Sequence, residues 1–358
     1  MALATASGGP VTPSTALVLA YRRTWWRRWA LAAALLSVAL VGFLLDVATG
    51  PAFLPVAAVA RTVVFGQGQD ASVTAIVWSI RLPVACTALV VGAALGLSGA
   101  VMQTILHNPL ASSYTLGVSA GAGFGAALVI VLGAGLPRSD TVSIPVMAIL
   151  FAALACAGVY LIGGARAATA EALVLAGIAL LFLFQALTSL LQLIASPEAL
   201  QQVVFWLFGS LQKATWTKLA IMVTVLVAGV AVLLPMAWRL TALKLGDARA
   251  EGLGVNVRAL RLKCFAVISA LTGVSVAFVG TIGFVGLVAP HIARMLVGED
   301  QRVFLPASAL AGAALLSVAS VASKTLMPGA VFPIGIVTSL IGVPFFVALV
   351  LRSRRSHW

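Results

Sequence analysis

Charged residues are scarce in this 358-residue sequence: Asp, Glu, Lys and Arg together make up 9 % of it, whereas 62 % is apolar. With a mean hydropathy of +1.13, this composition excludes an ordinary water-soluble domain. Apolar runs of about twenty residues recur along the chain, and each can cross a hydrocarbon core as a helix. The runs lack the period-two alternation of outer-membrane barrels. The sequence therefore predicts an all-α, polytopic transmembrane helical bundle.

Carboxylates are the scarcest charged groups. There are nine, and none lies in the middle of an apolar run. An ion-coupled carrier normally keeps an ionisable side chain near the bilayer midplane. The chain also lacks the Gly-x-x-x-x-Gly-Lys-Ser/Thr loop that binds nucleotide phosphates. If the chain moves a solute, we expect a transport subunit that is not an enzyme and that takes its energy from a separate nucleotide-hydrolysing partner.

Cysteine and histidine are also rare. Cys86, Cys156 and Cys264 lie in three different apolar runs without metal-ligand spacing, and we interpret them as buried apolar thiols. We therefore expect neither a metal site nor a cofactor bound by this chain.

The apolar runs predict about ten spans. We place them in a transmembrane domain over residues 29–351, between a cytoplasmic N-terminal segment (1–28) and a cytoplasmic tail (352–358). A polar lead precedes the first run, so no cleavable signal peptide is expected. The expected spans are Ala30–Leu45, Val84–Leu106, Thr115–Leu132, Val146–Ile162, Ala172–Ile194, Thr217–Trp238, Leu262–Thr281, Phe284–Val297, Phe304–Ala322 and Phe332–Leu351.

Basic residues are unevenly distributed between the two sides of the membrane. With the N-terminus inside, sixteen of 22 fall on the cytoplasmic side, which is where Lys and Arg next to spans stay. Both termini of this multi-pass protein of the inner (plasma) membrane are then cytoplasmic. The net charge of +13 follows from this asymmetry, and no soluble segment is long enough to bind nucleic acid. The six expected outside are Arg61, Arg81, Arg138, Lys213, Lys218 and Lys324.

The longest internal cytoplasmic loop, residues 241–261, is a candidate docking surface for the partner. Leu245-Gly246 and Leu253-Gly254 divide it into short helical pieces, with Asp247 placed to cap the second and Val255 and Asn256 leading into the third. A plain connector needs only a few residues. The alternative is a solvated basic loop that only holds topology.

Small residues recur at every fourth position in two stripes, Gly92-Gly96-Ala100 and Gly117-Gly121-Gly125. Such stripes let bilayer helices approach closely, and lining a pathway is a secondary reading. Between the stripes, Asn108 before Pro109 predicts a turn.

The eighth span is short and is interrupted by Pro290. The preceding Gly280 and Gly283 allow a tight re-entry of the chain. His291 and Arg294 lie one turn apart near its cytoplasmic end, and we interpret them as part of a joint against a partner subunit. His291 is not expected to bind a metal, because no second ligand lies at suitable spacing in the sequence. A proton relay through His291 would lack a buried acid to pair with.

These segments together resemble the FecCD family of permeases, the membrane subunits of type II ATP-binding-cassette importers for iron–siderophore chelates, haem and cobalamin. The resemblance covers nearly all of the chain from Arg81 onward. Its motifs, in order, are RLP (81–83), GAALGLSGAVMQ (92–103), NPLASSYTLGVSAGA (108–122), FWLFGSL (205–211), LGVNV (253–257), GFVGLVAPHIAR (283–294) and FPIGIVTSLIGVPFF (332–346).

The resemblance implies a homodimer with a path along its axis, two ATPase subunits that hold the ATP and Mg, and a periplasmic substrate-binding protein. The 241–261 loop would couple to the ATPase, flanked by His291 and Arg294. Arg81 matches one of the family's outer docking arginines. Two other docking arginines of the family are replaced here, one by Val84 and one by Lys324. An acidic residue usual in the ninth span is replaced by Ser320. Arg81 and Lys324 then remain to dock the binding protein.

The expected cargo is a ferric siderophore or a similar bulky metal chelate, with haem or cobalamin as alternatives. An ion-coupled carrier and a non-transporting scaffold are the alternatives of another class. Expected path-lining residues are Gly92, Gly96, Ala176 and Gly177. Thr169 and Ala170 are expected at a cytoplasmic gate, or else Thr169 is simply the N-cap of the fifth span.

Overall fold

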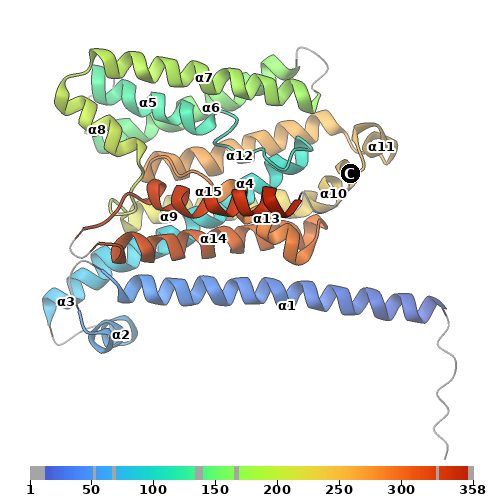
Figure 1. Cartoon of the computed structure of the whole chain (residues 1–358), viewed down its shortest axis with the longest axis horizontal. Coiled ribbons are helices and arrows are strands. Elements are labelled where there is room, and N and C mark those ends of the chain that lie inside the picture. Colours follow the sequence, from blue (N-terminus) through green and yellow to red (C-terminus); the bar gives the residue numbers. More distant parts are fainter. Residues whose placement is uncertain are drawn as a thin grey trace, which may run out of the picture.

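The protein is a bundle of helices (Figure 1). The computed structural model describes residues 13–50, 54–66, 70–133, 140–164, 169–327 and 330–353, and none of these residues lies in a strand. Seven of the helices in these ranges are long and apolar enough to cross a membrane. The all-α membrane fold predicted from the sequence is confirmed.

Each of the ten expected spans coincides with a helix or with a run of consecutive helices. Pro235 lies in the one-turn 3-10 segment η2, which joins α9 to α10 within the expected sixth span. The helices at the expected spans are α1 (Pro13–Ala48), α4 (Leu82–Ile105), α5 (Val118–Leu132), α6 (Asp140–Gly164), α7 (Ala170–Ile194), α9 (Trp216–Leu233) with η2 (Leu234–Met236) and α10 (Ala237–Leu243), α12 (Val257–Val279), α13 (Val285–Val297), α14 (Gln301–Thr325) and α15 (Ile334–Ser353).

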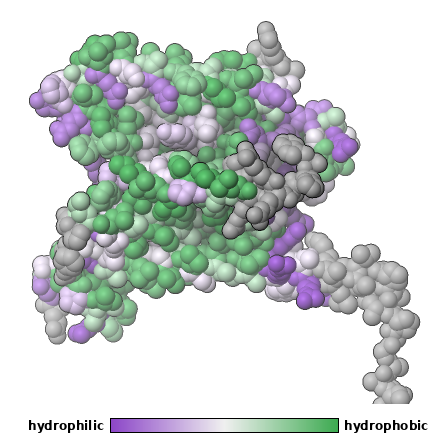
Figure 2. Space-filling view, viewed as in Figure 1, coloured by the Kyte–Doolittle hydropathy of each residue, from purple (hydrophilic) through white to green (hydrophobic). Residues whose placement is uncertain are grey.

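Five shorter elements complete the described fold: α2 (Val56–Phe65), α3 (Ala71–Ile76), the π-helical turn η1 (Val77–Arg81), α8 (Pro197–Leu207) and α11 (Asp247–Gly252). In Figure 1, α2, α3 and α8 lie at one end of the bundle and α10 and α11 at the other. We call these the α8 end and the α11 end. Figure 2 shows polar residues gathered at both ends and apolar residues along the sides between them. This distribution fits a bilayer around the sides of the bundle.

The centre of the bundle is the contact between α4 and α14. A Cβ atom at Gly92 would collide with the carbonyl oxygen of Gly312, and one at Gly96 with that of Ser308. The first small-residue stripe therefore serves close packing, as predicted. In the second stripe, Gly121 and Gly125 face the backbone of α6 at Phe151 and Met147.

Helix α1 runs the length of the bundle along α14 (Figure 1). Its 36 residues span about 54 Å at 1.5 Å per residue, more than the hydrocarbon core requires. The expected boundary at residue 28 therefore falls inside a continuous helix. Residues 1–12 and 354–358, parts of the expected N-terminal segment and tail, lie outside the described residues.

The re-entry expected before the eighth span is visible between α12 and α13. The chain turns within residues 280–284, where Gly280 has φ +76° and Phe284 has φ +65°. A side chain at Gly280 would collide with the carbonyl oxygen of Trp206 at the end of α8. The positive φ and this close approach together explain a glycine here.

Candidate functional site

The 241–261 loop forms a compact helical hairpin at the α11 end. Helix α10 ends at Leu243, α11 occupies Asp247–Gly252, and α12 begins at Val257. Gly246 and Gly254 lie at the two turns with φ of +98° and +80°, which L-residues rarely adopt. The division into short helical pieces at the two Leu-Gly pairs is thus confirmed.

Two leucines project from this hairpin. Leu245 is 54 % exposed and Leu253 is 52 % exposed, whereas the neighbouring Ala250 and Val255 are buried. The Val255 amide donates to the Ala250 carbonyl (3.0 Å), and Leu253 donates to Arg249 (3.1 Å). The hairpin therefore holds two apolar side chains outward on a backbone fixed by its own hydrogen bonds.

Asp247 does not cap α11, and the capping prediction is wrong. The N-cap position is occupied by Gly246, and no side chain caps this helix. The Asp247 carboxylate instead accepts two hydrogen bonds from Arg261, at 2.8 and 3.0 Å, and lies 3.4 Å from His107 Nε2. Asn256 does act as an N-cap, since it accepts from the Ala259 amide at the start of α12 (2.9 Å).

Arg261 connects the hairpin to the centre of the bundle. Its side chain is only 3 % exposed, and its Nε donates to the Ile105 carbonyl at the end of α4 (3.1 Å). A bidentate guanidinium–carboxylate pair has a fixed geometry as well as charge. Arg261 therefore connects α11 to the end of α4 through direct hydrogen bonds.

Glu299 forms a second anchor, between α13 and α14. Its carboxylate pairs with Lys244 at the start of the hairpin and with Arg294 Nε (3.0 Å). Arg294 also donates to Gln103 of α4 (2.8 Å). Burial alone would raise the pKa of Glu299, but the hydrogen bonds and charges of Lys244 and Arg294 outweigh it and hold that pKa below its usual value.

Of the two α13 residues expected to flank the loop, the structure links only Arg294 to it. His291 lies against α15, with its ring centroid 5.9 Å from that of Phe345. Among the described residues, no hydrogen bond or ion pair joins His291 to the hairpin.

Arg81 and Lys324, the residues expected to face a binding protein, are buried at the opposite end. Arg81 is 4 % exposed and donates to the carbonyls of Val47 (3.1 Å) and Ala48 (2.8 Å). Lys324 lies 2.9 Å from the buried carboxylate of Asp46. Both side chains thus hold the end of α1 against α4 and α14, and the expectation that they are presented to the outside is wrong.

The expected path-lining residues are also enclosed. Gly92 and Gly96 lie in the α4–α14 contact, and Gly177 faces Leu116 so closely that a Cβ would collide with its side chain. Ala176 is buried beside it. These four positions pack within the subunit, which contradicts their lining a path here.

At the expected gate, the Thr169 hydroxyl accepts from the Ala172 amide (3.3 Å), so Thr169 is the N-cap of α7. Ala170 follows as the first residue of that helix and is partly exposed. The four preceding residues, 165–168, lie outside the described residues.

The comparisons with known proteins agree with this architecture. The model of the FecCD transport family matches residues 38–352, which is most of the chain. The chain belongs to the FecCD transport family. FecCD proteins are the permeases of ATP-binding-cassette (ABC) importers, so this is a plasma-membrane transport protein and not itself an enzyme.

Two FecCD relatives and one solved structure show the extent of the similarity. The chain is 38 % identical to the hemin transport system permease HmuU of Yersinia pestis, over 78 % of this chain and 85 % of that protein. It is 35 % identical to the vitamin B12 import permease BtuC of Klebsiella pneumoniae, over 92 % and 95 %. A metal-chelate type ABC transporter solved in an inward-facing conformation superposes with a TM-score of 0.79 at 34 % identity, over 90 % of this chain and 99 % of that one.

The sequence interpretation missed the two residues that anchor the hairpin, Arg261 and Glu299. A signal for Arg261 was present. It falls on the same helical face as Val257, Cys264 and Ile268, all of them buried, so a charge there requires a partner. No comparable signal marks Glu299, because it lies in the short turn between α13 and α14.

Proposed function

We propose that this FecCD permease moves a ferric siderophore or a similar bulky metal chelate from the outside into the cytoplasm, as one half of a homodimer driven by separate ATPase subunits. The observation that supports the drive by ATPase subunits is the anchored hairpin. Two exposed leucines, Leu245 and Leu253, stand on a rigid element that is ion-paired to α12 and α13 and linked through them to α4. Haem and cobalamin, the cargoes named for the two relatives, are the alternatives.

In this proposal the hairpin docks on an ATPase subunit at the cytoplasmic side. Apolar side chains surrounded by polar ones are the composition of a docking patch. Here Arg249, Glu251 and Arg258 are exposed around the two leucines. ATP binding and hydrolysis on the partner would then move α4 and α13 through Arg261, Glu299 and Arg294, and so switch the access of the path.

We further propose that the path wall lies on α13 and α15 rather than on the stripe of α4. A hollow of about 700 Å³ opens there, lined mostly by apolar side chains, among them Phe284, Leu340 and Val343. Such a wall offers contact area without strong specific bonds, which suits the passage of a large cargo. Leu340 is 65 % exposed in the single subunit and would face the second copy or the path.

The binding protein would approach the α8 end, which the distribution of basic residues places outside. Since Arg81 and Lys324 are buried there, we propose that they position α1 and that the docking contacts come from exposed residues such as Arg61.

The test is uptake of a ferric siderophore into vesicles that contain the permease, its ATPase and external binding protein. We expect uptake to require ATP inside the vesicles, to be blocked by vanadate and to continue in the presence of an uncoupler. Full uptake in the presence of vanadate would contradict the proposal. Loss of uptake on adding an uncoupler, with ATP intact, would instead favour an ion-coupled carrier.

A further inference from the structure

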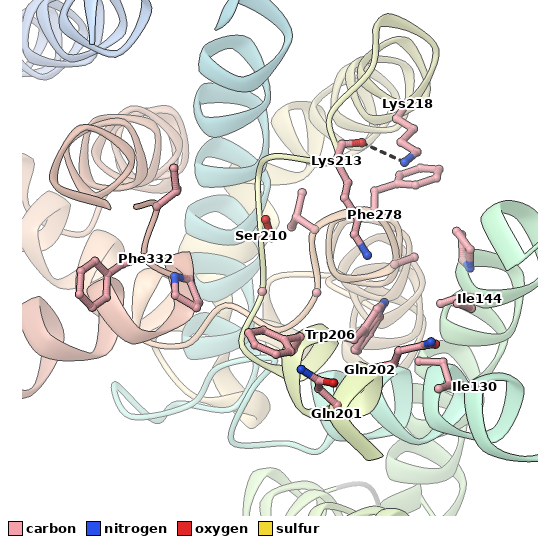
Figure 3. A pocket seen from close by; sticks show the side chains of 18 residues that line it. Ile130, Ile144, Gln201, Gln202, Trp206, Ser210, Lys213, Lys218, Phe278 and Phe332 are labelled. Atoms are coloured by element: carbon pink, nitrogen blue, oxygen red, sulfur yellow. Dashed lines mark hydrogen bonds between the residues drawn. The ribbon is translucent and has the colours of Figure 1, made fainter. Parts of the chain in front are cut away.

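A second hollow, of about 610 Å³, opens at the α8 end (Figure 3). Its wall comes from segments far apart in the sequence: α5, α6, α8, the turn after α8, the start of α9, the end of α12 and the segment before α15. The volume lies in the range typical of small-molecule sites. None of the residues so far placed in coupling or in the α13–α15 path wall lines it.

The polar part of the lining carries one sign of charge. Lys213 and Lys218 both line the hollow, together with the amides of Gln201 and Gln202, and no carboxylate is present among the lining residues that the structure describes. Figure 3 shows the Lys213 side chain reaching into the hollow, while the Lys218 ammonium donates to the Lys213 carbonyl (2.9 Å). No ion pair involves either lysine within the described part of the chain.

The apolar part of the lining is largely aromatic. Phe205, Trp206, Phe278 and Phe332 line the hollow together with the two lysines. Aromatic rings bind flat aromatic groups by stacking or edge contacts. Apolar walls also lower the local dielectric constant, so that two like charges in a hollow attract an anion more strongly than they would on an open surface.

The frame of the hollow is held by backbone hydrogen bonds across these segments. Ser210 N donates to Val279 O (2.7 Å), and Ile334 N donates to Gly209 O (3.2 Å). Both pairs join the turn after α8 to another wall of the hollow. A site built on connected backbone segments is pre-formed, which reduces the ordering that a ligand would otherwise require.

From this geometry we infer that the hollow is a receiving site for the cargo as it leaves the binding protein, and that the cargo is a metal chelate with net negative charge and aromatic groups. Ferric catecholates and haem share this chemistry. The inference rests on the proposed function and makes it narrower, since neutral aliphatic chelates are not expected to use the site.

The test begins with binding, which does not depend on transport. Equilibrium dialysis of the intact permease–ATPase complex uses ferric tris-catecholate, an anionic aromatic chelate, and a neutral ferric trihydroxamate as the matched probe. We expect Lys213→Glu to weaken catecholate binding roughly tenfold, equivalent to about 1.4 kcal/mol, and Lys213→Arg to retain it. The control is Arg27→Gln, which removes an exposed cation on α1 outside the hollow.

Uptake assays on the same variants complete the test. Reduced catecholate uptake with unchanged trihydroxamate uptake would support the site. Equal binding of catecholate to the wild type and to Lys213→Glu would overturn it. So would a loss of binding-protein affinity in cargo-free complexes of Lys213→Glu, because Lys213 would then be a protein-docking residue. If catecholate binds through Lys213 but no ATP-driven uptake occurs, the proposed function fails while the site stands.

Discussion

Breaking the Asp247–Arg261 pair should uncouple the hairpin from the bundle without unfolding the protein. Asp247→Asn keeps the shape of the side chain but removes the charge that faces the Arg261 guanidinium. Arg261 would then keep its hydrogen bond to Ile105 and a weakened one to the amide oxygen. The matched control is Glu171→Gln in the first turn of α7, which makes the same change from carboxylate to amide at an exposed side chain outside the hairpin.

The free-energy cost of Asp247→Asn follows from the unequal burial of Asp247 and Arg261. Removing one member of a fully buried ion pair costs about 3–5 kcal/mol. Arg261 is buried, but the Asp247 side chain is 40 % exposed, so that water replaces part of the lost interaction. We therefore expect Asp247→Asn to weaken the attachment of the hairpin by about 1–3 kcal/mol, the range for an unsatisfied buried hydrogen-bonding group. This shifts the balance between attached and detached hairpin by about 5- to 150-fold.

Two measurements on one vesicle preparation test this estimate. Hydrogen exchange at the Leu253 and Val255 amides reports detachment of the hairpin, and the ratio of chelate imported to ATP hydrolysed reports coupling. Asp247→Asn should raise the exchange rate and lower the ratio of chelate imported to ATP hydrolysed, whereas Glu171→Gln should change neither. Unchanged exchange and unchanged coupling in Asp247→Asn would refute the anchoring role of this pair.

Three further predictions concern single residues. Gly254→Val should lower uptake while ATP hydrolysis persists, because the positive φ at this position costs an L-residue about 1–2 kcal/mol. Gly252→Val, in equally open space but without a positive φ, should transport normally. Equal uptake by the two variants would contradict a role of the Gly254 turn in coupling. The pKa of Glu299 is depressed, so its pairs are complete above the ordinary glutamate value of about 4.3 and are lost as pH falls through the lower folded value. Coupling should accordingly be flat with internal pH from about 6 to 8, and a titration in that window that Glu299→Gln abolishes would contradict this. Arg81→Gln should lower the free energy of unfolding of the solubilised protein by about 1–3 kcal/mol, because it removes the hydrogen bonds to the end of α1, whereas Arg61→Gln should leave it unchanged. Weaker affinity of Arg81→Gln for the binding protein at unchanged stability would instead support a docking role for Arg81.

Much of the fold was predictable because each span carries its own signal. Length and apolarity identify a membrane helix independently of the rest of the chain, and all ten expected spans coincide with helices. Helix α8 was missed although Ser196 and Pro197 form a standard helix start, in which the Ser196 hydroxyl accepts from the Ala199 amide (3.2 Å).

The site was less predictable because its contacts join distant segments. Asp247 has the composition of a helix cap, and only the approach of Arg261 from α12 shows that its carboxylate is used elsewhere. Arg81 and Lys324 have the composition of surface cations, and their burial depends on Asp46 and on the end of α1, far away in sequence. Gly92 and Ala176 illustrate the same limit, since a small residue reads alike in a packed interface and in a path wall.

The central claim, that the hairpin receives its motion from an ATPase subunit, is tested most directly by photo-cross-linking from position 253 in the transporting complex. A photoreactive residue replacing Leu253 should form an adduct with the ATPase, and one replacing Leu193, an 81 % exposed leucine of α7, should not. A complex that imports chelate normally yet gives no ATPase adduct from position 253 would contradict the account.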